Sequence, residues 1–387
     1  MGFSVDVSRL DNRCHTPSAA VLHRGSERDA ALNDFCVPVN AYFPTPEMLR
    51  QLHAKLEHVL KYYPDENRNI AEVVAENFDL EPGNVVMGNG STELIAWIHR
   101  VWEMKRLMTP VPTFGRWTDY PLENGTCVQF HQRREDELFQ LNVDRLLAET
   151  RALGCTAVAI CNPNNPTGRL TDRNRLLELL DRLADLELIV IDESFLDFAG
   201  IDDVPTMIHE AVKRSNVIVL KSLGKNFGLH GMRAGYAVTN PHWAEKLRRA
   251  VPAWNVNAVA ELIIRSGFEQ QDAYQASREA TIVDRNYLRF QLEQFDQLTV
   301  FPSEANFVFV KLAEELDGIQ IRNRLLREFG VLIRECGSKF GSTSQYYRIA
   351  ARPKRDCDQL AAAFRKVLAT LNSNTRQEPR ISSHLLG

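Results

Sequence analysis

Four short runs of apolar residues recur through the middle of the chain. They are VVM before Gly88, AVAIC before Asn162, LIVI before Asp192 and VIVL before Lys221. A strand that is apolar at every position is typical of a sheet covered on both faces. Between the runs, leucines recur at helical spacing, as in residues 173–186. This alternation of strand and helix predicts an α/β fold, with a mostly parallel central sheet and helices on both faces.

The pattern changes toward the C-terminus. The segments FPSEANFVFVKL, GVLIREC and YYRIAARP read as a few strands mixed with helices such as residues 358–371. We therefore predict a large domain over residues 46–275 and a smaller α+β domain over residues 276–371. Residues 1–45 are expected to join the small domain. Residues 372–387 are polar and lack periodicity, which predicts a flexible tail.

Composition narrows the class of protein. The chain has 387 residues, enough for an ample core, and a net charge of −4. A weakly acidic chain without a basic run gives no support to nucleic-acid binding. The seven cysteines lack CxxC spacing, so they read as free thiols and not as a disulfide framework or a zinc site. The sequence begins without a secretory signal and has no membrane-length apolar run, so we expect a cytoplasmic protein without membrane partners.

The polar clusters stand where a ligand would bind. They are GNGSTE after VVM, NPNNPTG after AVAIC, DES after LIVI and KSLGK after VIVL. In open parallel sheets, ligands gather at the carboxyl ends of the strands, where the connecting loops meet. The sequence therefore predicts one site built from four separate segments.

Lys225 is the candidate for covalent chemistry. It stands in SLGKNFGLHGMRAGY, just beyond the VIVL run, so it would face the site from the end of a buried strand. Burial lowers the pKa of a lysine and favours Schiff-base chemistry. Ser222 and Arg233 flank it and can grip a phosphate, the arginine by a bidentate contact. A lone lysine is normally a solvated surface residue. The assignment of Lys225 to covalent chemistry therefore depends on the surrounding segment and on its place after a buried strand.

Asp192, in LIVIDESF, suits a particular cofactor. Pyridoxal 5′-phosphate (PLP) needs a carboxylate near its pyridine nitrogen, because the protonated ring is then an electron sink. Asp192 could instead be a plain helix N-cap. A Walker-B carboxylate is a third interpretation, but it requires a GxxxxGK[ST] loop. The one Gly-Lys pair, Gly224 and Lys225, has Val219 at the upstream glycine position and Asn226 after it.

Two further segments fit a phosphorylated ring. Asn165 in NPNNPTG can hydrogen-bond the phenolic oxygen of the cofactor, although Asn-Pro clusters are usually plain turns. In GNGSTE, Gly90 lets the backbone approach an anion, and Ser91 and Thr92 open a helix whose N-terminus favours phosphate. Glu93 stands where a dinucleotide fingerprint has its third glycine, which argues against that alternative.

Taken together and in order, these segments resemble the fold-type I PLP-dependent aminotransferase superfamily, classes I and II. The residues that carry the resemblance are GNGSTE, PTF, NPNNPTG, DESF, SLGKNFGLHGMRAGY and YYRIAARP. The resemblance spans residues 23–371 and is greatest to the branch of histidinol-phosphate aminotransferases and threonine-phosphate decarboxylases. It implies the fold-type I architecture, PLP as cofactor, a small amino-acid or amino-phosphate substrate, and a homodimer with shared active sites.

The resemblance also implies a role for each matching residue. Lys225 would hold PLP as a Schiff base and move the α-proton, and Asp192 would pair with the pyridine nitrogen. Arg348 would bind a carboxylate or phosphate of the substrate, and Arg334 a second anionic group. The other implied cofactor residues are Gly90, Ser91, Thr92, Phe114, Asn165, Phe195, Ser222, Arg233 and Tyr63, the last reaching the cofactor phosphate of the neighbouring subunit.

Two departures from the family pattern bear on the reaction. Most aminotransferases have a tyrosine three residues past the aspartate, against the ring oxygen, where this chain has Phe195. Loss of that hydroxyl should raise the imine pKa, and the decarboxylase side of the branch often tolerates phenylalanine there. The segments HRGSERDAA and NDFCVPVN also resemble that side, with His23 and Asn40 as substrate contacts. The family's usual Asn-Pro, however, reads Asn-Ala from Asn40.

Two reactions remain open on this evidence. In an aminotransferase, Lys225 moves a proton from the α-carbon to the ring-side carbon, and the cofactor carries an amino group. In an α-decarboxylase of a phosphorylated or phosphonylated amino acid, CO2 leaves and Lys225 reprotonates the carbanion. The outcome depends on how Arg348 and Arg334 orient the substrate. The breadth of the superfamily favours transamination, and the intact set of Lys225, Asp192 and Asn165 argues against PLP binding without catalysis.

Overall fold

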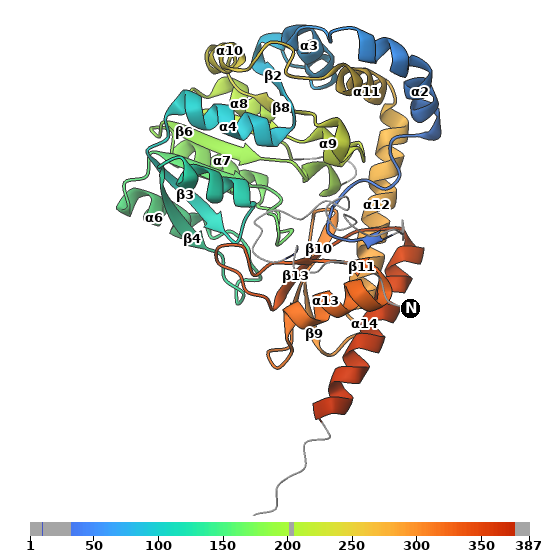
Figure 1. The fold of residues 1–387 in the computed structure, drawn as a ribbon. Coiled ribbons are helices and arrows are strands. Elements are labelled where there is room, and N and C mark those ends of the chain that lie inside the picture. Colours follow the sequence, from blue (N-terminus) through green and yellow to red (C-terminus); the bar gives the residue numbers. More distant parts are fainter. Residues whose placement is uncertain (1–9, 11–31, 201–204, 376–387) are drawn as a thin grey trace, which may run out of the picture.

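The computed structural model describes residue 10 and residues 32–200 and 205–375. A large domain surrounds a seven-stranded sheet, and a smaller domain surrounds a four-stranded one (Figure 1). The predicted α/β class is confirmed, with a mostly parallel sheet between helices and a second, smaller domain.

The central sheet has the strand order β2-β8-β7-β6-β5-β3-β4. All neighbours pair in parallel except at β8, which runs antiparallel to β2 and β7. The strands are β2 (Val85–Gly88), β3 (Arg106–Val111), β4 (Cys127–Gln132), β5 (Ala157–Cys161), β6 (Leu188–Asp192), β7 (Val217–Lys221) and β8 (Gly235–Val238). The four apolar runs of the sequence form β2, β5, β6 and β7, and every residue of these strands is buried. Because helices cover both faces, these strands show no polar alternation.

The helices of the large domain pack as two layers. Residues of α3, α6, α7, α8 and α11 share one apolar cluster, and residues of α4 and α10 belong to another. The α-helices are α2 (Pro46–Lys61), α3 (Asn67–Asn77), α4 (Ser91–Trp102), α5 (Asp119–Glu123), α6 (Val143–Ala152), α7 (Arg173–Arg182), α8 (Ile208–Lys213), α9 (Leu223–Asn226), α10 (Pro241–Ala250) and α11 (Ala258–Phe268). Short 3-10 turns are η2 (Pro82–Asn84), η3 (Gly115–Trp117), η4 (Leu196–Phe198) and η5 (His230–Met232).

Helix α7 is shorter than its leucine spacing predicts. The spacing extends to residue 186, but the helix ends at Arg182. Leu183 leaves the helical conformation, and its side chain and that of Leu186 still reach the core. The leucine spacing therefore marks buried positions, and these extend beyond the end of the helix.

The small domain is built on an antiparallel sheet of order β12-β13-β10-β9. Its elements are β9 (Leu298–Phe301), β10 (Phe307–Leu312), α13 (Gly318–Phe329), β11 (Val331–Leu332), β12 (Arg334–Glu335), β13 (Tyr346–Ala350) and α14 (Lys354–Thr375). Strand β1 (Asn33–Asp34) pairs in parallel with β11. Phe35, which follows β1, is buried in the apolar cluster of this domain. The chain before α2 therefore packs on the small domain before it reaches the large one.

Helix α12 (Gln271–Leu292) connects the two domains (Figure 1). Tyr274 packs against the core of the large domain, while Leu288 and Leu292 lie in the core of the small one. The boundary expected between residues 275 and 276 falls inside this helix. A continuous helix, in place of a loop, therefore carries the small domain.

Helix α14 is longer than the helix that residues 358–371 predict. It continues to Thr375 and so includes residues 372–375 of the segment that its polar composition predicted to be a flexible tail. Each residue added to an existing helix gains a hydrogen bond without a new nucleation cost, which lets a helix run into a polar segment. Among the described residues, no helix is both long and apolar enough to span a membrane.

Candidate active site

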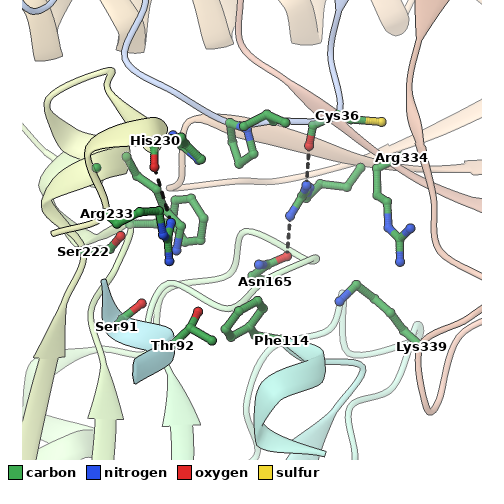
Figure 2. A pocket seen from close by; sticks show the side chains of 16 residues that line it. Cys36, Ser91, Thr92, Phe114, Asn165, Ser222, His230, Arg233, Arg334 and Lys339 are labelled. Atoms are coloured by element: carbon green, nitrogen blue, oxygen red, sulfur yellow. Dashed lines mark hydrogen bonds between the residues drawn. The ribbon is translucent and has the colours of Figure 1, made fainter. Parts of the chain in front are cut away.

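A cavity of about 300 Å3 lies between the two domains, at the carboxyl ends of the parallel strands. It collects most of the residues that the sequence analysis proposed. The proposed residues that line it are Ser91, Thr92, Phe114, Asn165, Phe195, Ser222, Lys225, Arg233, Arg334 and Arg348. In Figure 2, Ser91, Thr92, Ser222 and Arg233 gather at one end, Arg334 and Lys339 lie at the other, and Asn165 and Phe114 lie between them.

The first end is shaped for an anion. Helix α4 begins at Ser91, and its N-cap is Gly90 with φ +80°, so no side chain covers the N–H groups of the first turn. A Cβ on Gly90 would stand 2.5 Å from Nη2 of Arg233. Glycine is therefore needed both for the backbone angle and for the approach of the guanidinium. The hydroxyls of Ser91, Thr92 and Ser222, the helix N-terminus and Arg233 together form a site suited to phosphate.

Lys225 projects from the short helix α9 toward two aromatic rings. Its Nζ lies 4.2 Å from the ring centroid of Phe195 and 5.6 Å from that of Phe114. Burial lowers the pKa of Lys225 to about 8, while Asp192 opposes the shift and Arg348 adds to it. An amine with this pKa has a reactive neutral fraction near neutral pH, which both carbonyl condensation and proton transfer require.

Asp192 ends strand β6 and is buried behind the cavity wall. Its Oδ2 accepts a hydrogen bond from Nε1 of Trp117 at 3.0 Å, and its Oδ1 accepts one from the backbone N–H of Ser194 at 3.1 Å. The second bond is the local, turn-forming role that a plain aspartate can play. The first comes from a distant residue and holds the carboxylate in one orientation. Trp117 was not among the proposed site residues.

Arg348 links the small domain to the large one across the cavity. It lies on β13, and its Nη1 donates to Oδ1 of Asn165 at 2.8 Å. Its Nη2 donates to the backbone carbonyl of Cys36. Burial lowers the pKa of Arg348 to about 10. Arg334 pairs with Arg348 in the β12–β13 register and donates to Oγ of Ser338 at 2.9 Å.

His230 and Lys339 are among the cavity residues that the sequence analysis did not propose. His230 lies within the SLGKNFGLHGMRAGY segment, so its place in the motif was a usable signal. Burial, with Lys225 and Arg233 nearby, lowers the pKa of His230 to about 4, so it is neutral at physiological pH. Lys339 lies in the connection between β12 and β13 and is buried. No local pattern marked Lys339, because its position depends on a loop of the small domain reaching the large one.

Of the proposed residues that the structure describes, Gly90, Asp192, Asn40 and Tyr63 do not line the cavity. Asn40 is buried, and its Nδ2 donates to the backbone carbonyl of Asn226 at 3.0 Å and to Oγ of Ser277 at 2.7 Å. It therefore ties the chain before α2 to α9 and α12, one residue away from Lys225. Tyr63 lies on the surface, 79% exposed, and stacks on Trp254 with ring centroids 4.6 Å apart. His23 lies outside the described residues.

The charged side chains that line the cavity are all positive. Lysine or arginine side chains line it from both domains, and no Asp or Glu appears among its described lining residues. An enclosed site of this kind favours ligands that carry several negative charges. Phosphate suits the α4 end, and further anionic groups suit the small-domain end.

Comparison with known proteins identifies the family. Residues 44–364 match the family described as aminotransferase class I and II. The chain belongs to this family. This confirms the predicted superfamily, and its cofactor is PLP. The anion-binding end at α4, the amine of Lys225, the buried carboxylate of Asp192 and the ring of Phe114 fit that group in charge and in chemistry.

Two relatives and one solved structure are similar over most of their length. L-serine phosphate decarboxylase of Sulfurospirillum multivorans is 30% identical over 316 residues, which cover 80% of each chain. Threonine-phosphate decarboxylase of Salmonella typhimurium is 30% identical, over 89% of this chain and 96% of that protein. Histidinol-phosphate aminotransferase of Sinorhizobium meliloti, solved in complex with pyridoxal-5′-phosphate, has the same fold. It superposes with a TM-score of 0.82 at 22% identity, over 92% of this chain and 96% of that one.

Proposed function

We propose that this chain is a PLP-dependent α-decarboxylase of a small O-phosphorylated amino acid, of the class of L-serine O-phosphate or L-threonine O-phosphate. The observation that carries the proposal is the small-domain end of the cavity, where Arg348, Arg334 and Lys339 converge. A phosphate monoester has nearly two negative charges at neutral pH, and the α-carboxylate adds another. Three cations match this charge. Relatives at 30% identity that decarboxylate amino acids of this class lend further support.

The side chains of this cavity can divide the work of such a reaction. When bound, PLP supplies an electron sink for the electron pair that is left on the α-carbon as its bond to the carboxylate breaks. Arg348 and Arg334 would orient the substrate through its anionic groups. Phe114 and Phe195 would keep water away from the reacting carbon. After CO2 has left, the ammonium of Lys225 would donate one proton to the α-carbon, which yields the amine.

Transamination is the second candidate, and it is the reaction that the sequence alone favoured. The same Nζ of Lys225 could carry a proton from the α-carbon to the cofactor instead of replacing CO2. Phe195 favours decarboxylation, because its ring offers no hydroxyl to the cofactor and packs edge-on against Phe307, with ring centroids 5.1 Å apart. The order of the two candidates is therefore reversed relative to the sequence interpretation.

A product assay separates the two reactions. The holoenzyme incubated with L-serine O-phosphate or L-threonine O-phosphate should release CO2 and the corresponding phosphorylated amine in equal amounts. Unphosphorylated L-serine is the matched control and should react poorly, because it leaves the distal cations without a partner. Histidinol phosphate has no carboxylate, so turnover of that compound can only be amino transfer. Formation of a 2-oxo acid from the phosphorylated amino acids, without CO2, would overturn the proposal.

We also propose that the protein is a homodimer in which Tyr63 reaches the cofactor phosphate of the other subunit. Tyr63 and Trp254 form an exposed aromatic pair, and Arg233 at the phosphate end of the cavity is exposed in the single chain. A second subunit would cover both. The cavity as one chain builds it therefore lacks a wall at that end.

The dimer has a direct test in subunit complementation. We expect a dimer at micromolar concentration in sedimentation, and low activity in Tyr63→Ala and Lys225→Ala alone. Co-expressing the two variants should restore activity, because a mixed dimer holds one site with both residues intact. Tyr62→Ala is the matched control and should keep activity on its own. A fully active monomer, or no recovery in the mixed dimer, would contradict shared sites.

A further inference from the structure

We propose that Lys339 is the residue that makes the distal subsite select a phosphate over a carboxylate. This inference rests on the proposed function, because it concerns the anionic end of the same substrate. Lys339 belongs to the small domain, but its Nζ donates to the backbone carbonyl of Thr113 in the large domain, at 2.8 Å. The side chain lines the cavity, and Figure 2 shows its amine end pointing toward the space between Arg334 and Phe114.

The loop that carries Lys339 is fastened to the large domain at further points. Nε2 of Gln132 donates to the backbone carbonyl of Gly341 at 3.3 Å. Phe340 stacks on Phe130 with ring centroids 4.9 Å apart. Gly341 has φ +72°, a left-handed backbone conformation that favours glycine and lets the loop approach Gln132 closely. The ammonium is therefore held in place before a ligand arrives, which lowers the ordering cost of binding.

The chemistry of three adjacent cations explains the selectivity. Arg334 and Arg348 suffice for two carboxylates, one each, since a guanidinium meets two oxygens in one plane. A phosphate monoester carries a third terminal oxygen and nearly a second charge. Among the described residues, Lys339 Nζ donates one hydrogen bond, to the backbone carbonyl of Thr113, and an ammonium has three donors. Lys339 thus has hydrogen-bonding capacity left for a third oxygen.

Lys339 also titrates in a useful range. Burial, together with Arg334 and Arg348 on the adjoining strands, lowers the pKa of Lys339 to about 7. The thiols of Cys336 and Cys161 also face it, but burial raises the pKa of both above their usual values. Because its pKa lies near neutrality, Lys339 is costly to charge, and a bound dianion would compensate for that cost better than a carboxylate would.

The test compares two short primary amines, one ending in a phosphate monoester and the other in a carboxylate. Binding of O-phosphoethanolamine and of β-alanine to the PLP-loaded protein is measured by titration calorimetry. Lys339→Met should weaken the binding of O-phosphoethanolamine by about ten- to a hundredfold, because one buried charged hydrogen bond is lost. The affinity for β-alanine should change by less than about threefold, and Lys339→Arg should keep the phosphate preference. Equal losses for both ligands, or none for O-phosphoethanolamine, would overturn the inference.

Two controls keep the result interpretable. Gln132→Ala removes one loop contact without changing the charge of the cavity, so it should lower the phosphate preference far less than Lys339→Met does. Above pH 7 the preference should decline in the wild type, as Lys339 loses its proton, and not in Lys339→Arg; this comparison cancels the titration of the ligand. If CO2 release fails while the preference depends on Lys339, only the proposed reaction is wrong. If CO2 is released and Lys339→Met keeps the preference, only this inference is wrong.

Discussion

Lys225→Ala should lower turnover by at least about 10³-fold, within the range for loss of a positioned proton carrier, while the protein still binds PLP. The variant loses the amine that would hold the cofactor covalently and the proton that would return to the α-carbon. It keeps Ser91, Ser222 and Arg233, which line the phosphate end of the cavity. Activity, the absorbance of the bound cofactor, and the mass of the borohydride-reduced protein measure these effects.

The test depends on which lysine carries the reduced cofactor after borohydride treatment, because two other buried lysines lie nearby. Lys221, on β7, is paired with Glu193 at 3.1 Å and with Asp197 at 3.3 Å. Although burial alone would lower the pKa of Lys221, these carboxylates raise it, so its amine stays charged and is a poor nucleophile. Lys339 has a low pKa but lies at the opposite end of the cavity from the phosphate site. A reduced adduct on Lys221 or Lys339 in the wild type would refute the central assignment.

Asp192→Asn should lower turnover by about 10²- to 10³-fold, the scale for removing a preorganised electrostatic group from an enclosed site. The amide cannot keep the pyridine nitrogen protonated, and an unprotonated ring is a poor electron sink. The stability cost should be only about 1 kcal/mol, that of weakening one local, turn-forming hydrogen bond. Turnover and urea unfolding of the same variant compare the two effects.

Two variants separate the charge of Asp192 from its structural contacts. Trp117→Phe removes the 3.0 Å hydrogen bond to Oδ2 but keeps the carboxylate, so its effect on turnover should be the smaller one. Loading Asp192→Asn with N-methylated PLP, whose ring nitrogen is permanently positive, should restore part of the activity. Near-wild-type turnover in Asp192→Asn, or no rescue, would return Asp192 to a purely turn-forming role.

The sequence by itself determined the layout of the large domain and the chemistry of its central residues. Strands β5, β6 and β7 are covered on both faces, so their apolar runs stand out without knowledge of their neighbours. Because parallel strands end at the same edge, Asp192 and Lys225 could be assigned to one site from their positions after two such runs. Local patterns sufficed wherever a residue's environment was set by its own strand and loop.

Tertiary structure decided what depended on contacts between distant segments. Trp117 meets Asp192 across 75 residues, and Lys339 meets Thr113 across 226, so neither partnership has a local signature. Asn40 shows the reverse case. Its segment resembled a substrate-binding motif, yet its side-chain amide donates hydrogen bonds to α9 and α12. The direction of a side chain follows from how its element packs against elements far away in the chain. Hydrophobic spacing therefore predicted where the cavity forms, and the packing of the two domains decided which cations face it.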